Sequence, residues 1–537
     1  MMKSGSTTYF LAIILLMTSI EGLAQSWHDY QNVLSRYPLL YTSNAAALTS
    51  FTPSDSAQFL MGDTRLELSM GQGHMEQLNK SPHAWQTRAG VQSIYRMSRR
   101  VVVRGMMDYK YEWGTQAGGS VWIEPEQRPF DITETADSTR GNISLETYSL
   151  DGLVGVDVGH GVSLGARFGY TTATGAKKKD PRHTNSLMHC DVGVGATWKL
   201  GSLTLGADYL MKRTTEALKF STVGRTDQIY HYLIDNGAFF GRKETTDGNG
   251  YVGSSNERPF LDIKHGMAIL TAYQHGTWDL GAEGRWMHRH GHFGLESPSM
   301  IDFNRHNGDE CTIRLWWQRD IEDRFNRVTV SWDHQALNDH ERTYRVVTNH
   351  GVTDVNYYDD RLIGNNNEDV IALSGETQWG VRNNLATWQA AIDLCHTRRS
   401  LTASLFPFYR QQQTHLTQVT LQGGHNRMSS GGQVCSVLMT TGYADGGGTP
   451  YFDGEYQQAG DDAVRPQDNM LYLMREYEYL TARRIIVGMD LGWSMPLERH
   501  DMRLYIHGRY RYNQAFDVHH LQDGYRHQVA IEVGCRF

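Results

Sequence analysis

The sequence predicts an all-β protein, and within that class a transmembrane antiparallel β-barrel of about 18 strands. Three observations predict it: a polar, aromatic-rich composition, an alternation of apolar and polar residues along the chain, and an alternation of short and long connections. Of 537 residues, 39% are hydrophobic and 20% are charged. That composition is too polar for a bundle of transmembrane helices. The formal net charge of −8 gives no reason to expect a nucleic-acid partner.

Residues 1–24 have the pattern of a cleaved signal peptide. Lys3 supplies a positive charge, residues 10–17 form an unbroken apolar run, and Ala24 is a small residue of the kind that precedes a cleavage site. We therefore expect an exported chain that begins at Gln25.

The next segment, residues 25–56, is predicted to be periplasmic or plug-like, and the barrel is predicted to span 57–537. The segment is rich in large apolar and aromatic side chains: Trp27, Tyr30, Leu34, Tyr37, Leu39, Leu40 and Tyr41. Leaving such surface in water costs about 25 cal/mol per Å². We therefore expect residues 26–53 to pack against the inner wall or the periplasmic mouth of the barrel.

Period-2 patterning predicts the strands. In the last ten residues, Val529, Ile531, Val533, Cys535 and Phe537 share one face, whereas Gln528, Glu532 and Arg536 share the other. Similar runs start near Val101, Leu150, Val162, Cys190, Leu203, Leu280, Cys311 and Met502. One charged face and one aliphatic or aromatic face are typical of strands that separate lipid from an aqueous lumen.

The connections between these runs indicate which β architecture is present. Short ones lie at 98–100, 160–161, 200–202, 276–277, 320–325, 380–384, 429–431 and 496–501. Long polar stretches lie between them at 114–143, 177–186, 223–259, 295–309, 347–368 and 442–469. Transmembrane barrels have short periplasmic turns and longer extracellular loops. Soluble sandwiches and propellers have no reason to show this alternation.

The charged strand faces predict the lining of the lumen. The candidates are Arg104, Asp108, Lys110, Glu112, Arg167, Asp191, Asp208, Glu283, Arg285, Arg314, Arg503, Arg509 and Glu532. Two interpretations remain open. The charges either tune the selectivity of a solvated pore, or they form a lattice of cross-strand ion pairs that fills and stiffens the interior.

His288, His290 and His292 alternate on one predicted strand, so their imidazoles share a face and are weak candidates for a transition-metal site. The competing interpretation is a polar stripe at the extracellular rim. No cofactor is expected and no catalytic residue is assigned, because the sequence has no HExxH or Walker motif.

The alternating run that ends at Phe537 resembles the C-terminal targeting signal of Gram-negative outer-membrane barrels, with Val533, Cys535 and Phe537 as its signal residues. That resemblance implies recognition by the barrel-assembly machinery and a place in the lipid of the cell outer membrane. With the Ala-Gln cleavage context and the Tyr-rich strands, the chain resembles outer-membrane proteins of Bacteroidota. It is similar to large barrels of that phylum that are assigned to domains of unknown function. Residues 43–48 also resemble the Asn-Pro-Ala-Gly-Leu motif of fatty-acid-transporter-like barrels, although Ala45 replaces the Pro.

Three functions are compatible with these patterns. A channel or transporter for small solutes with a polar, partly obstructed lumen is favoured, because about 18 strands enclose a lumen wide enough for water. The first alternative is a non-conducting accessory or scaffold barrel whose partner is a surface lipoprotein or an uptake or secretion complex. The second alternative is a rim-active membrane enzyme.

Overall fold

The structure is a computed structural model that describes residues 30–52, 58–222, 229–253, 257–297, 300–350, 352–382, 385–497 and 502–537. The predicted signal peptide, residues 1–24, lies outside the described residues. Among the helices in these ranges, none has the length and apolar character needed to span a membrane.

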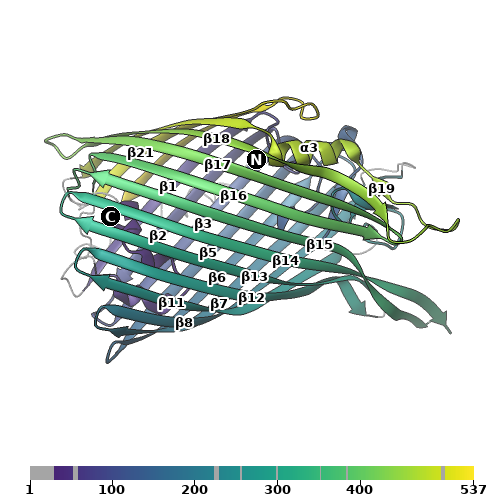
Figure 1. Ribbon diagram of the computed structural model, residues 1–537, viewed down its shortest axis with the longest axis horizontal. Coiled ribbons are helices and arrows are strands. Elements are labelled where there is room, and N and C mark those ends of the chain that lie inside the picture. Colours follow the sequence, from purple (N-terminus) through teal and green to yellow (C-terminus); the bar gives the residue numbers. More distant parts are fainter. Residues whose placement is uncertain are drawn as a thin grey trace, which may run out of the picture.

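In the described part of the chain, 18 antiparallel strands form one closed sheet (Figure 1). They are β1 (Phe59–Gln72), β2 (His83–Arg96), β3 (Val101–Ala117), β5 (Gly141–Gly159), β6 (Val162–Lys177), β7 (Arg182–Leu200), β8 (Leu203–Ser221), β11 (Arg258–His275), β12 (Trp278–Ser297), β13 (Met300–Ile321), β14 (Arg324–Asn349), β15 (Val352–Trp379), β16 (Trp388–Leu405), β17 (Phe408–Met428), β18 (Val434–Glu455), β20 (Arg484–Leu497), β21 (Met502–Ala515) and β22 (Tyr525–Arg536). Each strand pairs with the next, and β22 pairs with β1 to close the ring. The predicted antiparallel barrel of about 18 strands is confirmed.

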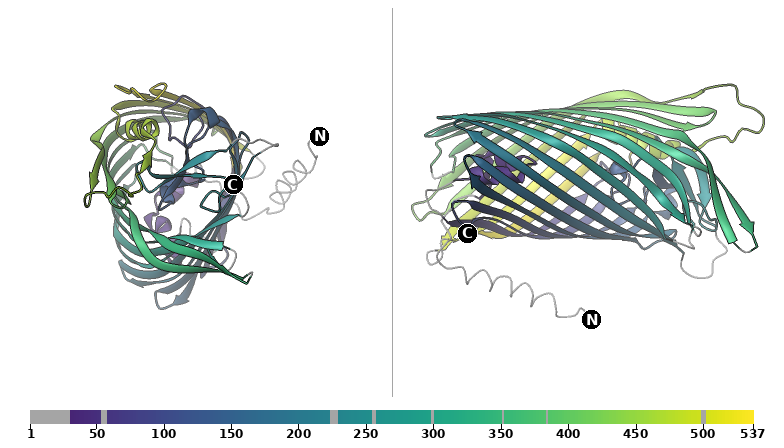
Figure 2. Two further views of the ribbon diagram at one scale, coloured as in Figure 1. Left: turned by 90° about the vertical axis from the view of Figure 1, so that its right-hand side faces the viewer. Right: turned by 90° about the horizontal axis from the view of Figure 1, so that it is seen from below.

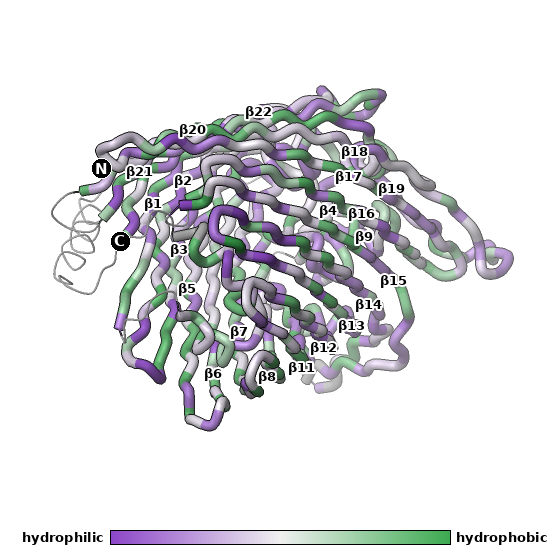
Figure 3. The backbone as a smooth tube through the Cα atoms, turned by 60° about the vertical axis from the view of Figure 1, so that its left-hand side comes forward, coloured by the Kyte–Doolittle hydropathy of each residue, from purple (hydrophilic) through white to green (hydrophobic). Residues whose placement is uncertain are grey.

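The alternation of side chains places apolar residues on the outside of the ring. On β22, Val529, Ile531 and Val533 are 40%, 54% and 41% exposed, whereas the intervening Glu532 bonds to Arg509 on the inner side. Figure 3 shows the same mixture of hydrophobic and hydrophilic positions along the other strands. An apolar outer surface on so many strands is far larger than a soluble protein leaves in water. It is the lipid-facing band of a transmembrane barrel.

Two of the stretches predicted as long connections are instead paired strand. Residues 295–309 contain the end of β12 and the start of β13, and residues 347–368 contain the end of β14 and the start of β15. These segments are mostly polar, so the period-2 pattern fades although the backbone pairing continues. The β14–β15 hairpin consequently projects beyond the rest of the ring (Figure 1).

In the described residues 30–52, three short helices precede β1 and lie inside the barrel, at the end with the short turns (Figure 2, right). They are α2 (Tyr30–Ser35) and the 3-10 helices η1 (Pro38–Tyr41) and η2 (Ala45–Ser50). Their apolar side chains pack on the inner wall in one buried cluster: Val33, Leu34, Leu40, Leu48, Phe51, Phe59, Met61, Ile94 and Val102. We call residues 30–52 the plug. The end that holds it is periplasmic in barrels with this loop pattern.

Three connections at the opposite end fold into the ring (Figure 2, left). They contribute a small sheet in the order β19 (Gln467–Asp468), β10 (Phe240–Thr245), β9 (His231–Asp235) and β4 (Asp131–Glu134). They also contribute the helix α3 (Met470–Thr481) and the 3-10 helices η3 (Pro125–Gln127) and η4 (Asp137–Thr139). We call residues 118–140, 229–253 and 457–483 the cap. Its main apolar cluster includes Trp122, Phe130, Tyr232, Ile234 and Phe293.

Candidate functional site: the lumen and its two inserts

The charged residues that the sequence predicts for the lumen lie on the inner side of the strands. Asp108, for example, follows the outward-facing Met107, which is 55% exposed, and Asp208 precedes the outward-facing Tyr209, which is 49% exposed. The contacts of the candidates fall into two groups. Arg104, Glu283 and Arg314 bind the plug, and others, such as Asp108, Arg167 and Arg509, form ion pairs across the wall.

Cross-strand ion pairs cover the part of the wall between the plug and the cap. The Asp108 carboxylate lies 2.8 Å from Arg88 Nε and 3.4 Å from Arg65 Nη2. Arg509 Nη2 lies 2.7 Å from Glu67 and 2.8 Å from Glu532. A further cross-strand pair joins Arg167 to Asp151, Lys110 pairs with Glu112 along β3, and Arg285 donates a hydrogen bond to Thr312. Such a lattice stiffens the wall while keeping it polar.

Side chains of the wall hold the plug by its backbone carbonyls. The donors and acceptors are Arg96 to Phe51 (2.6 Å), Arg104 to Leu40 (3.2 Å), Arg314 to Tyr41 (3.0 Å), Gln318 to Arg36 (2.7 Å) and Arg327 to Ser35 (2.6 Å). Short helices leave their terminal carbonyls without partners inside the helix. The wall guanidinium groups therefore satisfy acceptors that would otherwise be buried without a partner.

Ser43 and Asn44 join the plug to the wall between η1 and η2. The backbone N and Oγ of Ser43 donate to Glu283 Oε1 at 2.7 and 2.8 Å. Asn44 Nδ2 donates to the carbonyls of Ala196 and Ala207 on β7 and β8. Its Oδ1 accepts from the N–H of Ala46 and so caps η2.

Glycines on the inner wall make room for η2. A Cβ at Gly165 would overlap the backbone nitrogen of Ala46, and a Cβ at Gly195 would lie 2.5 Å from Asn44 Oδ1. The wall and the plug are thus fitted to each other at backbone level.

Buried ion pairs join the cap to the wall. Arg128 of the cap pairs with Glu216 of β8 at 2.6 Å, with side chains that are 1% and 0% exposed. Glu134 on β4 pairs with Lys177 at the end of β6. Breaking one partner of such a pair typically costs about 3–5 kcal/mol, because the other charge stays buried.

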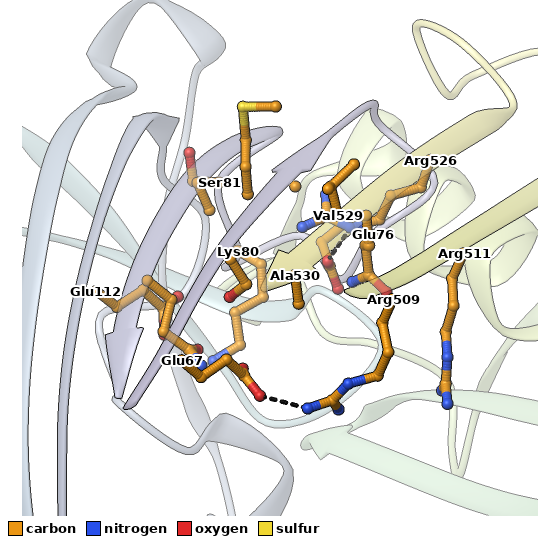
Figure 4. A pocket seen from close by; sticks show the side chains of 16 residues that line it. Glu67, Glu76, Lys80, Ser81, Glu112, Arg509, Arg511, Arg526, Val529 and Ala530 are labelled. Atoms are coloured by element: carbon orange, nitrogen blue, oxygen red, sulfur yellow. Dashed lines mark hydrogen bonds and ion pairs between the residues drawn. The ribbon is translucent and has the colours of Figure 1, made fainter. Parts of the chain in front are cut away.

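A cavity of about 360 Å³ lies against β1, β2, β21 and β22 (Figure 4). Its lining carries both signs of charge, and two pairs are formed across it: Arg509 with Glu67, and Arg526 with Glu76 at 2.8 Å. Lys80 and Arg511 also line it.

A second cavity, of about 480 Å³, lies between the cap and the wall strands β15, β16, β17 and β20. We call it the subcap cavity. Four buried side-chain atoms on its lining have no hydrogen-bond partner among the described residues: Asn236 Oδ1, Asn366 Oδ1, Arg399 Nε and Arg484 Nε.

Two cap carboxyls on the subcap cavity have strongly raised pKa values. Burial raises the pKa of Asp235 to about 7, although the N–H groups of Gly237 and Phe240 donate to the carboxylate. Burial also raises the pKa of Asp131 well above its usual range, and the nearby charge of Asp235 adds to that effect. The cavity therefore contains acidic groups that form no ion pair with a cation among the residues that the structure describes.

The histidine stripe on β12 lies on the outer side of the barrel. His288 and His290 alternate with the buried Met287 and Arg289 and follow the exposed Trp286. Across the strand pair, the His265 ring lies 5.9 Å from His288 and 5.7 Å from His290. Among the described residues, no group of three or more His, Cys, Asp and Glu side chains is placed to hold a metal ion.

The predicted targeting residues lie on the strand that closes the barrel. Val533 and Cys535 of β22 pair opposite Leu66 and Thr64 of β1. The backbone N–H of Phe537 donates to the Gly62 carbonyl at 3.1 Å, and the Gly62 N–H donates back to Phe537 at 2.7 Å.

Sequence reasoning missed the subcap cavity. Its acidic residues lie in long connections, where no alternation marks an inner or outer face. One available cue was the position of Asp235, which directly follows the apolar run Tyr232–Ile234 inside a stretch that is otherwise polar.

Comparison with known proteins gives one family and several distant structural similarities. The Family of unknown function (DUF6850) matches the chain over residues 46–537. No curated protein matches the chain.

Similar solved structures include the outer membrane transporter YddB from Escherichia coli, which is 7% identical over 89% of this chain and 81% of that chain, with a TM-score of 0.41. The ferric preacinetobactin receptor BauA from Acinetobacter baumannii is 7% identical over 89% and 80% of the two chains, with a TM-score of 0.38. The ferric enterobactin receptor PfeA from Pseudomonas aeruginosa, a mutant form, is 8% identical over 89% and 80%, also with a TM-score of 0.38.

Proposed function

The chain belongs to the Family of unknown function (DUF6850), and we propose that this member is a channel or transporter that passes small polar solutes through its lumen. We further propose that it resides in the outer membrane of a bacterium of the Bacteroidota type, after cleavage of residues 1–24. In this proposal the barrel-assembly machinery recognises the strand that ends at Phe537.

One observation carries the proposal: the barrel surrounds a charged inner wall, and the plug at its periplasmic end is bound to that wall by hydrogen bonds from wall side chains as well as by apolar packing. Arg104, Arg314 and Arg327 each donate to a plug carbonyl. Hydrogen bonds of this kind exchange readily with water, at a net cost of about 1 kcal/mol each. A polar wall around a separable insert suits a lumen that admits water and solute.

The projecting hairpin supports the alternative of an accessory or scaffold barrel. Pairing of β15 with β16 begins at Gly364, so residues 352–363 pair only with β14 and have a free backbone edge. Tyr358 and Leu362 on this segment are 67% and 52% exposed. Free strand edges and exposed apolar side chains are features that a partner protein can bind. In this alternative the partner is a surface lipoprotein or an uptake complex.

Single-channel conductance in planar bilayers tests the proposal. We expect the intact protein to show a small, noisy conductance, and deletion of residues 26–53 to raise it without preventing insertion. Glu283→Gln, which weakens the two bonds to Ser43, should give an intermediate value. Glu310→Gln is the control, because Glu310 pairs with Lys264 on the wall.

Two results would contradict the proposal. If the intact protein conducts like an open porin, the lumen is not obstructed. If neither the intact protein nor the deletion variant conducts, the accessory or scaffold function is the better one.

A further inference from the structure

We propose that the subcap cavity binds a zwitterionic solute, with the solute's carboxylate at Arg484 and its ammonium group at the acidic cap residues Asp131 and Asp235. This is the chemistry shared by amino acids and short peptides. The inference deepens the proposed function and rests on it for the route by which a solute reaches the cavity. It is carried by the uncompensated charges and unpartnered amides on the cavity lining.

Arg484 is a wall guanidinium that has no carboxylate partner in the described part of the chain. Its Nη1 donates to the Tyr479 carbonyl at the end of α3, at 3.0 Å, and its Nε has no partner among the described residues. By contrast, the neighbouring Arg399 pairs with Glu476 at 3.2 Å. A guanidinium has five donors in a planar fork that matches a carboxylate. The free side of Arg484 is therefore suited to a solute carboxylate.

Asp131 and Asp235 supply the opposite charge. Asp131 accepts from Ser120 Oγ and from the Ile132 N–H, both at 2.6 Å, and Asp235 accepts from the Gly237 and Phe240 N–H groups at 2.8 and 3.0 Å. Neither forms an ion pair in the described part of the chain. Burial raises both pKa values, so a cation in the cavity would favour the ionised carboxylates.

Amide oxygens complete the lining. Asn236 is 3% exposed, and its Nδ2 donates to the Ser404 carbonyl at 2.9 Å, which orients Oδ1 away from that bond. Within the described ranges, Asn236 Oδ1 and Asn366 Oδ1 have no hydrogen-bond donor. They can accept from the N–H groups of an ammonium or a peptide bond. Glu368 also lines the cavity and adds negative charge on the wall side.

The size and the mixture of charges define the solute class. A volume of about 480 Å³ is within the range of ligand sites for small molecules. A solute with only negative charge would leave Asp131 and Asp235 uncompensated, and a solute with only positive charge would leave Arg484 uncompensated. A neutral sugar could satisfy the amides but neither charge. A zwitterion satisfies all of them.

Isothermal titration of the full-length, detergent-purified protein tests the inference. The probes are L-alanine, alanyl-alanine and trialanine, which separate amino acids from peptides. N-acetyl-alanyl-alanine, which lacks the ammonium, alanyl-alanine amide, which lacks the carboxylate, and glucose are the comparison ligands. We expect at least one zwitterion to bind at least ten-fold more tightly than each comparison ligand.

Two variants test which residue binds the carboxylate of the solute and which binds its ammonium group. Arg484→Gln should weaken zwitterion binding at least ten-fold and leave the affinity for the amide unchanged. Asp235→Asn, which retains the acceptor for the Gly237 and Phe240 N–H groups, should instead leave the affinity for the acetylated ligand unchanged. Asp131→Asn serves as a second acidic variant. Arg511→Gln, on the other cavity, is the matched control and should bind as the wild type does.

Equal affinities for all ligands, a preference for glucose, or unchanged binding in folded Arg484→Gln would overturn the inference. Heat-modifiable mobility on gels verifies folding of each variant. Failure of the proposed function can be distinguished from failure of this inference. If the protein binds zwitterions but shows no conductance, only the passage of solute is contradicted.

Discussion

At the scale of single residues, the side of the strand decides what a substitution does. Ile531 on β22 is 54% exposed and faces outward, whereas Gln528 on the same strand lines the 360 Å³ cavity. Asp108 shows that an inward position is not automatically tolerant. An arginine there would add a third guanidinium beside Arg65 and Arg88 and remove their shared carboxylate.

We expect Ile531→Arg to destabilise the barrel by about 2–4 kcal/mol, the cost of an arginine near the bilayer midplane. Gln528→Glu, which places a charge on the inner face opposite Arg511, should change the free energy of unfolding far less. Denaturant unfolding in lipid vesicles, followed by tryptophan fluorescence, measures both. Equal losses for the two variants would show that the faces are assigned wrongly.

Asp235 should give the cap a pH dependence opposite to that of an ion-paired carboxylate. Burial raises its pKa from 3.8 to about 7, so between these values the folded cap retains a proton that the unfolded chain has released. Cap stability should therefore fall as pH rises from about 4 to 7, by at most about 1.4 kcal/mol per pH unit, and level off outside that range. Asp131 and Glu476 face this carboxyl and add to the effect.

Hydrogen–deuterium exchange of residues 236–245, corrected for the intrinsic pH dependence of exchange, measures that slope. Asp235→Asn should flatten it. An unchanged slope in this variant would assign the pH dependence to another group.

At the scale of elements, the sequence predicts the strand faces, because one face meets lipid and the other meets the lumen. It does not predict the structure of the plug and the cap. Glu532 and Arg509 could be placed on the inner face from the period-2 pattern alone, because a strand between lipid and water must alternate. The extensions of β14 and β15 could not be predicted from this pattern, because both of their faces meet water. The inward fold of the cap could not be predicted from the sequence either. Its buried pairs, such as Arg128 with Glu216, join residues that are 88 positions apart.

The contact between η2 and the glycines of the inner wall can be tested by substitution. We expect Gly165→Ala to displace η2, because the added methyl group would overlap the backbone nitrogen of Ala46, while the barrel itself still assembles. The readouts are faster proteolysis within residues 30–52 and a raised single-channel conductance. Gly152→Ala on the neighbouring strand is the matched control, because its Cβ would meet nothing within 4 Å. Equal protease resistance of the two variants would show that the glycine is not needed to seat the plug.

At the scale of the whole molecule, the plug and the cap occupy the two ends of one lumen. In the proposed function a solute crosses both inserts, so their resistances add in series. Both inserts pack apolar side chains in buried clusters. The plug is in addition held by side-chain-to-backbone hydrogen bonds, whereas the cap is anchored by buried ion pairs such as Arg128 with Glu216. Removing one partner of a buried ion pair costs more than removing one such hydrogen bond.

This arrangement predicts how conductance responds when the inserts are loosened separately and together. Deleting residues 26–53 removes one resistance and leaves the cap. Glu216→Ala leaves Arg128 buried without its partner and should loosen the cap by about 3–5 kcal/mol. Each change alone should raise single-channel conductance only by the share of resistance that it removes. The combined variant should conduct more than the product of the two separate increases predicts, because a series path opens fully only when both obstructions are gone. If the deletion alone reaches the conductance of an open porin, the cap does not obstruct the lumen, and its anchoring pairs serve only to stabilise the extracellular end.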